Sequence, residues 1–95
     1  MFCCKTFRSR HHFVVAICDK ELIGKEIRKN PKFRVEKDFY FEKYIGERKA
    51  LELMRRATIG NLVGKRIIKL ALKKKFISEE NVMFIGDVPH AQFIQ

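Results

Sequence analysis

The chain has 95 residues, 46% of them hydrophobic, and its 21 Lys and Arg exceed its 11 Asp and Glu, which gives a formal net charge of +10. This length fits one domain, residues 1–95, and the apolar content, including nine Phe, excludes a disordered chain. The apolar stretches are far shorter than the ~20 residues that cross a bilayer, and the N-terminus lacks a secretory pattern. We therefore expect a cytoplasmic protein without a membrane partner.

The positive charge favours a polyanionic partner, because bound cationic side chains release counterions and steer association. Nucleic acid is the common intracellular polyanion, so RNA or a ribonucleoprotein is the expected partner. Two alternatives remain open. The charge can serve solubility alone in a Lys-rich proteome, or it can match an anionic protein or membrane surface.

The N-terminal residues predict a β-hairpin. Phe2–Arg8 and Phe13–Cys18 have the composition of two short strands joined by a polar turn. A four-residue loop places Cys3 opposite Cys18, whereas a loop one residue shorter or longer breaks that pairing. Three cysteines are an odd number in a chain with no export signal, so we expect thiols that pack as small buried side chains.

The middle of the chain predicts turns and one strand. Asp19–Gly24 resembles a helical turn whose first side chain accepts backbone N–H bonds and whose last residue ends it. Asn30-Pro31 indicates a turn, after which Phe33 and Val35 alternate with charged residues as in a half-exposed strand. Residues 38–41 are expected to be a loop or strand end that brings aromatic side chains into the core.

Two helical patterns follow. Glu47–Thr58 has one apolar and one charged face. A second pattern starts near Asn61, and on one straight helix its apolar stripe points roughly 140° away from the first. We therefore predict two consecutive helices with a break around Thr58–Asn61, where Gly60 lowers helix propensity.

The last third of the chain completes the predicted fold. Ser78 is expected to cap a short turn, and Val82–Ile85 is predicted as the last strand, followed by the segment Gly86–Gln92. The order of elements is two strands, a turn, a strand, two helices and a strand. This order predicts an α+β fold with a small, mainly antiparallel sheet and two consecutive helices packed on one face.

The second predicted helix carries a cluster of positive side chains on its outer face. The cluster comprises Lys65, Arg66, Lys69 and Lys73, with the neighbouring Lys74 and Lys75. No acidic residue lies between Glu52 and Glu79, so the helix forms no i,i+4 ion pairs within itself, unlike ordinary solvated helices. We expect this face to contact phosphate groups, and a merely solvated face is the alternative.

Motifs for catalysis or metal binding are not apparent. The three Cys and three His have no CxxC or HxxxH spacing, and adjacent strand residues such as Cys3 and Cys4 point to opposite faces. A Gly-rich phosphate loop, an HExxH motif and a nucleophile elbow are also missing. We therefore predict a non-enzymatic protein with neither metal nor cofactor, and a small enzyme using His90 is the third-ranked alternative.

Three segments, Asp19–Lys25, Ala57–Gly64 and Ile85–Gln92, resemble a small archaeal family, domain of unknown function 424 (DUF424). The similarity covers nearly the whole chain, and Val88–Gln92 is its most specific part. The family has no established activity, although RNA binding has been suggested for it. The resemblance therefore implies an archaeal cytosolic source and a translation or ribosome context.

A second candidate site applies if the basic cluster reflects only composition. It is the polar set Lys25, Tyr40, Asn61, His90 and Gln92, residue types that stack on bases or hydrogen-bond a backbone and that lie beside turns. Two of these residues have structural alternatives. Asn61 can be a helix N-cap, and Tyr40 can be a core aromatic with its hydroxyl at the edge.

These observations favour an RNA-binding or ribosome-associated accessory protein. Its basic helix is expected to contact the phosphate backbone, and Tyr40, His90 and Gln92 are expected to add selectivity. The alternative is a protein–protein interaction module in a translation or RNA-processing complex, with an exposed apolar surface or one that suits an acidic partner.

Overall fold

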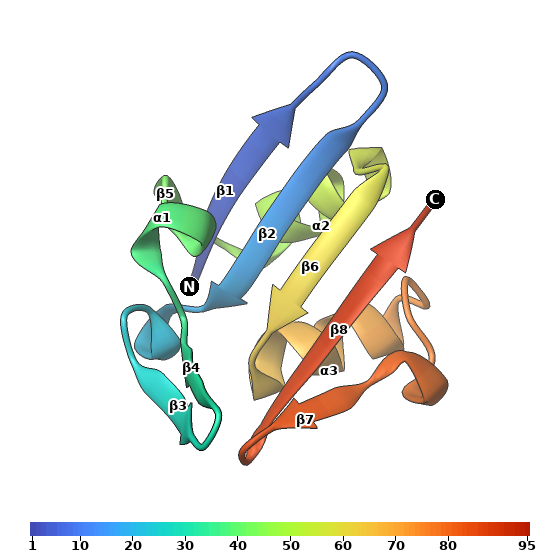
Figure 1. The fold of residues 1–95 in the computed structure, drawn as a ribbon. Helices are drawn as coiled ribbons and strands as arrows, with labels where there is room; N and C mark the ends of the chain where they lie inside the picture. The colour runs from blue at the N-terminus through green and yellow to red at the C-terminus, as the bar shows by residue number, and fades with distance from the viewer.

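The computed structural model describes all 95 residues and contains a six-stranded mixed sheet and a separate two-stranded hairpin (Figure 1). The α+β class is confirmed. The large sheet comprises β1 (Phe2–Arg8), β2 (Phe13–Asp19), β5 (Lys43–Ile45), β6 (Ile59–Val63), β7 (Met83–Ile85) and β8 (Val88–Ile94). The hairpin comprises β3 (Glu26–Lys29) and β4 (Lys32–Arg34). The helices are α1 (Lys37–Tyr40), α2 (Glu47–Arg56) and α3 (Lys65–Lys73), with 3-10 turns η1 (Lys20–Leu22) and η2 (Glu79–Asn81).

The strand order in the large sheet is β5-β1-β2-β6-β8-β7. Only β2 and β6 pair in parallel, so the sheet is mainly antiparallel, as predicted. The N-terminal hairpin has the register expected for a four-residue loop, with Cys3 opposite Cys18 and Arg8 opposite Phe13. The Asn30-Pro31 turn joins β3 to β4 and contains a cis peptide bond.

The prediction of two consecutive helices was wrong, because strand β6 lies between α2 and α3 in the chain. The helix phase does break at Thr58, but the residues that follow form a central strand between β2 and β8. Three of its residues are buried, whereas Ile59 and Asn61 are half-buried. The short run Ile-Gly-Asn-Leu-Val does not show the apolar–polar alternation of a half-exposed strand, so it carried no strand signal. Gly60 therefore does not mark the predicted break between two helices but lies within a strand. It leaves room for the ring of Phe93 on β8, which a Cβ atom would meet.

The segment after Ile85 was also mispredicted, because it contains β8, which pairs with both β6 and β7. Pro89 does not break this strand, since it lies just beyond the last β6–β8 pair, Val63 with His90. There its carbonyl accepts the Gly64 N–H at 2.9 Å, while the Gly64 carbonyl accepts an N–H within α3. The missing proline N–H therefore leaves no acceptor unpaired.

The turn after β2 forms as predicted, but the Asp19 side chain does not cap it. Its two carboxylate oxygens instead accept the backbone N–H groups of Arg66 and Ile67 at the start of α3, each at 2.9 Å. Gly64, at φ +126°, allows this approach because a Cβ atom there would meet the carboxylate. Burial raises the pKa of the Asp19 carboxyl above its ordinary value, and the two N–H bonds oppose the rise.

Of two further predicted short elements, one formed as expected and one did not. Ser78 forms the expected cap of η2. Residues 37–40 form the short helix α1 rather than a loop or strand end, although Tyr40 enters the core as expected. None of the helices is long and apolar enough to cross a bilayer.

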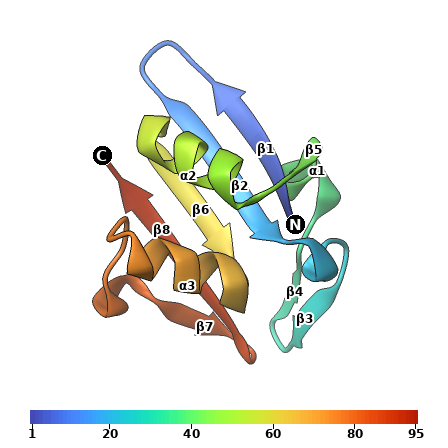
Figure 2. The same cartoon turned by 180° about the vertical axis from the view of Figure 1, so that it is seen from behind.

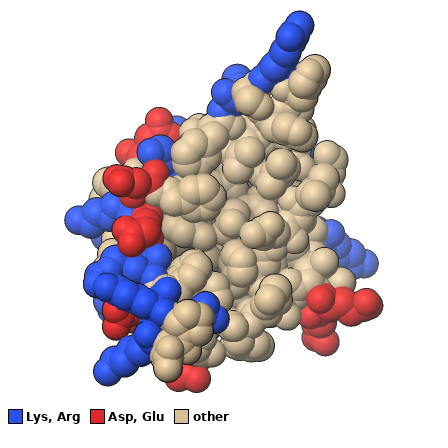
Figure 3. Space-filling model, in the orientation of Figure 1, with Lys and Arg blue, Asp and Glu red and all other residues tan.

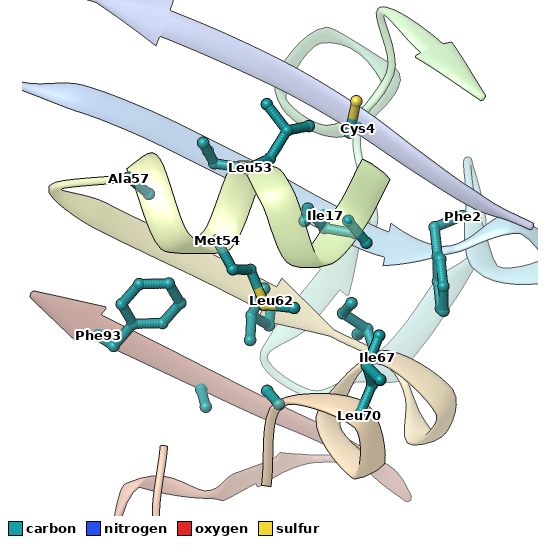
Figure 4. Close-up of a cluster of buried hydrophobic side chains, with 14 of the residues drawn as sticks. Phe2, Cys4, Ile17, Leu53, Met54, Ala57, Leu62, Ile67, Leu70 and Phe93 are labelled. Carbon is teal, nitrogen blue, oxygen red and sulfur yellow. The ribbon is translucent and has the colours of Figure 1, made fainter. Parts of the chain in front are cut away.

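The core lies on both faces of the sheet. Helices α2 and α3 cover one face (Figure 2), and the cluster beneath them includes Ile17, Met54, Leu62 and Ile67 (Figure 4). A smaller cluster on the opposite face contains Cys3, Ala16, Cys18, Val35, Tyr40 and Val63. All three cysteines are free and buried, and burial raises the pKa of their thiols, so they pack as small neutral side chains. On this second face α1 covers only part of the sheet (Figure 1), and the far ends of β6 and β8 face solvent.

Candidate functional site

The structure divides the residues of the two candidate sites between the two faces of the sheet. The basic cluster lies on α3, on the helix-covered face (Figure 2). Tyr40, Asn61, His90 and Gln92 meet on the opposite face around one depression. Lys25 is exposed in the loop between η1 and β3 and does not line this depression.

We call this depression the polar hollow. Its lining comprises Phe33, Arg34, Glu36, Phe39, Tyr40, Asn61, His90 and Gln92. Asn61 on β6 lies directly opposite Gln92 on β8, and His90 precedes Gln92 by two residues. Side chains two residues apart on a strand point to the same face, so the β6–β8 pairing itself brings these three together. Helix α1 and strand β4 supply the aromatic side.

Tyr40 fixes the orientation of the Asn61 side chain. The tyrosine is 3% exposed, and its hydroxyl donates to Asn61 Oδ1 at 2.6 Å. Burial raises the pKa of the Tyr40 phenol far above its ordinary value, so the group stays a neutral donor. With Oδ1 occupied, the amide hydrogens of Asn61 remain as donors at the hollow. Tyr40 is thus a core aromatic that positions a polar group, and Asn61 lies within a strand rather than at a helix N-cap.

His90 is oriented by the backbone of the neighbouring strand. Its Nδ1 lies 3.0 Å from the Leu62 carbonyl oxygen. A carbonyl only accepts, so Nδ1 carries the hydrogen and, in the neutral ring, Nε2 is left as an acceptor. Gln92 is exposed and offers both a donor and an acceptor. The hollow therefore presents a mixed set of hydrogen-bonding groups along one side.

On the aromatic side of the hollow, Phe39 contacts two other aromatic rings. Phe39 stacks on Phe7 with ring centroids 5.3 Å apart and meets Tyr40 edge-on at 4.8 Å. Arg34 at the rim donates from Nη1 to the Gly24 carbonyl at 2.7 Å. Figure 3 shows that the centre of this face of the molecule carries no Lys, Arg, Asp or Glu, and that the charged side chains gather at its margin. This face therefore offers aromatic rings and neutral hydrogen-bonding groups, with Arg34 and Glu36 as the charged residues that line the hollow.

The basic cluster on α3 has the opposite character. Lys65, Lys69, Lys73, Lys74 and Lys75 are all exposed, and none takes part in the four ion pairs of the structure. Arg66 differs, because its Nε and Nη2 atoms donate to the two Glu21 carboxylate oxygens at 3.0 and 2.6 Å. The hydrogen bond from Arg66 lowers the pKa of Glu21 to about 2. Arg66 therefore holds η1 to α3 and is less available to an external anion than the lysines.

A third feature is the exposed edge of the sheet. Edge strand β7 has two large apolar side chains in solvent, Met83 at 65% and Phe84 at 66% exposure. Phe84 lines a groove between β7 and α3 together with Ile68 and Leu72.

The DUF424 family model, described as a protein of unknown function, matches residues 7–95. This chain belongs to the DUF424 family. The family expected from the three sequence segments is thereby confirmed. The DUF424 chain also resembles the crystal structure of an uncharacterized conserved protein from Methanopyrus kandleri, with a TM-score of 0.82 and 20% identity. The match covers 97% of this chain and 89% of the other, and at this identity it shows a shared fold alone. No protein with a curated description matches the sequence.

Several groups at these surfaces of the DUF424 protein are not predicted from its sequence. The sequence predicts Phe33 as a strand residue and Phe39 as a core residue, and both line the hollow. The aromatic run at residues 39–41 was the available signal. No sequence signal pointed to Glu21 as the partner of Arg66, because the two residues are 45 positions apart in the chain.

Proposed function

We propose that this DUF424 protein is a non-enzymatic, cytoplasmic RNA-binding or ribosome-associated accessory protein of archaeal type, whose α3 lysines contact the phosphate backbone. The observation that carries the proposal is the set of five exposed α3-side lysines that lack an acidic partner. Arg66, the one basic residue of the cluster with a partner, supports the fold instead.

The spacing of these lysines suits a nucleic acid backbone. Lys65, Lys69 and Lys73 follow one another at four-residue intervals, about 6 Å along the helix axis. Each lysine that neutralises a phosphate releases counterions, which supplies affinity without reading sequence. This predicts RNA binding that is tolerant of base sequence and sensitive to ionic strength.

A charge-matched pair of variants tests the proposal. The α3 variant combines Lys69→Gln, Lys73→Gln and Lys74→Gln. At about 0.1 M salt it should bind a structured RNA at least tenfold more weakly than the unmodified protein, since three phosphate contacts are lost. Equilibrium binding to labelled RNA measures the effect.

The control variant removes three positive charges elsewhere, through Arg10→Gln, Lys29→Gln and Lys43→Gln. All three positions are exposed and lie outside α3. Its affinity should fall only slightly. Equal losses in the two variants would show that net charge, rather than the α3 surface, drives the association.

A protein-interaction module is the second candidate, and the exposed pair Met83 and Phe84 on an edge strand favours it. Large apolar side chains beside unpaired strand edges are typical of protein contacts. Co-purification from the native cytosol with and without nuclease separates the candidates. Partners that survive nuclease but are lost with Phe84→Ser support the module, whereas loss of all partners on nuclease treatment supports RNA.

A further inference from the structure

We propose that the polar hollow is a binding pocket for one unpaired nucleobase. This inference rests on the proposed RNA function and adds a second contact, made by the face of the sheet opposite α3. It gives Asn61, His90 and Gln92 a common ligand.

The residues that line the hollow match both the flat faces and the polar edge of a base. A base has flat apolar faces and a hydrogen-bonding edge, and proteins bind unstacked bases through aromatic rings and polar side chains together. The hollow places the rings of Phe33 and Phe39 beside the side chains of Asn61, His90 and Gln92. A ligand with only one of these features would leave half of the lining unused.

Two of the polar groups, those of Asn61 and His90, are already oriented before any ligand arrives. The Tyr40 hydroxyl occupies Asn61 Oδ1, and the Leu62 carbonyl holds His90 Nδ1. What remains is a donor from Asn61, an acceptor at His90 Nε2, and both from Gln92. Preorganised groups lose less conformational freedom on binding, which is the condition for recognising a single base.

The sparse charge on this face argues for the base rather than the phosphate as the group recognised. The centre of the face is uncharged (Figure 3), and Arg34 at the rim is accompanied by Glu36. Binding here should therefore depend little on salt, in contrast to binding at α3. Because the sheet separates the two surfaces, an RNA that reaches both must bend or present an extruded nucleotide, as structured RNA does.

The test uses the whole protein and two RNA tetranucleotides, one with four bases and one in which all four positions are abasic. The side-chain amide NMR signals of Asn61 and Gln92 should shift with the first and not with the second. Gln92→Ala combined with Phe33→Leu should weaken binding of the intact tetranucleotide by about tenfold, through loss of stacking and one hydrogen bond.

Tyr44→Leu is the matched control, because Tyr44 is an exposed aromatic residue on β5, outside the hollow. It should leave the affinity unchanged. Equal binding of the two tetranucleotides, or unshifted amide signals at millimolar RNA, would overturn the inference.

The α3 variant separates this inference from the proposed function. If that variant loses RNA affinity while the amide signals never respond, the function stands and the base pocket falls. If the amide signals respond while the α3 and control variants bind RNA equally, the pocket stands and the role of α3 falls.

Discussion

On the α3 side of the sheet, lysines project from a helix whose own sequence places them, whereas the opposite side gathers a hollow from four separate elements. The first surface is charged and exposed, and the positions of its lysines do not depend on the details of side-chain packing. The second is uncharged at its centre, and Asn61 and His90 depend there on hydrogen bonds to Tyr40 and to the Leu62 carbonyl. One small sheet thus holds an electrostatic surface and a shape-dependent one, and the two respond to different perturbations.

The largest difference in stability is expected between a substitution on the buried face of β6 and one at the exposed end of β8. Leu62→Ala should lower the free energy of unfolding by about 2–5 kcal/mol, because the side chain is fully buried beneath α2 and α3. Ile94→Ala, at a side chain 82% exposed, should change it by no more than about 0.5 kcal/mol. Urea denaturation measures both, and equal losses would show that the open face is covered in solution.

The next effect concerns how α3 is attached. Asp19→Ala leaves the N–H groups of Arg66 and Ile67 without their acceptor and should cost about 1–3 kcal/mol of stability. Asp19→Asn keeps one acceptor oxygen and should cost less. Thermal and urea unfolding of the two variants measure the difference. If both variants were as stable as the unmodified protein, α3 would not depend on this long-range cap.

The smallest effect is a pH dependence of the Glu21–Arg66 pair. The pKa of Glu21 is lowered to about 2, so its stabilising contribution is fully present above about pH 4.5 and is lost as pH falls towards 2. The contribution should stay below about 1 kcal/mol, because the side chains of Arg66 and Glu21 are 43% and 55% exposed. Urea titrations of the protein and of Glu21→Gln at pH 6 and pH 3 measure it. A variant that loses as much stability on acidification as the parent would contradict the assignment.

Local sequence patterns predicted the elements whose stabilising contacts are local. The N-terminal hairpin, the helix from Glu47 and the Ser78 cap all follow from residues that are near neighbours in the chain. The lysine face of α3 belongs to this class as well, because helical spacing alone sets it.

The remaining features depend on distant residues. Strand β6 has five residues and no regular apolar–polar alternation, so its apolar residues resemble the start of a helix until β2 and β8 are placed beside it. Asp19 could be recognised as a capping residue, but its target lies 47 residues away. The hollow needs both the β6–β8 register and the packing of α1. Its polar residues, Asn61, His90 and Gln92, and Tyr40 could be named from their chemistry, but the sequence could not bring them together.

The salt dependence of RNA binding shows how many phosphate contacts the α3 lysines make. The logarithm of the association constant should fall linearly with the logarithm of salt concentration. The slope of the α3 variant should be shallower than that of the control variant by about 2 to 3, the equivalent of three lost phosphate contacts. Identical slopes for the two variants would contradict the claim that the α3 lysines form the surface on which RNA lies.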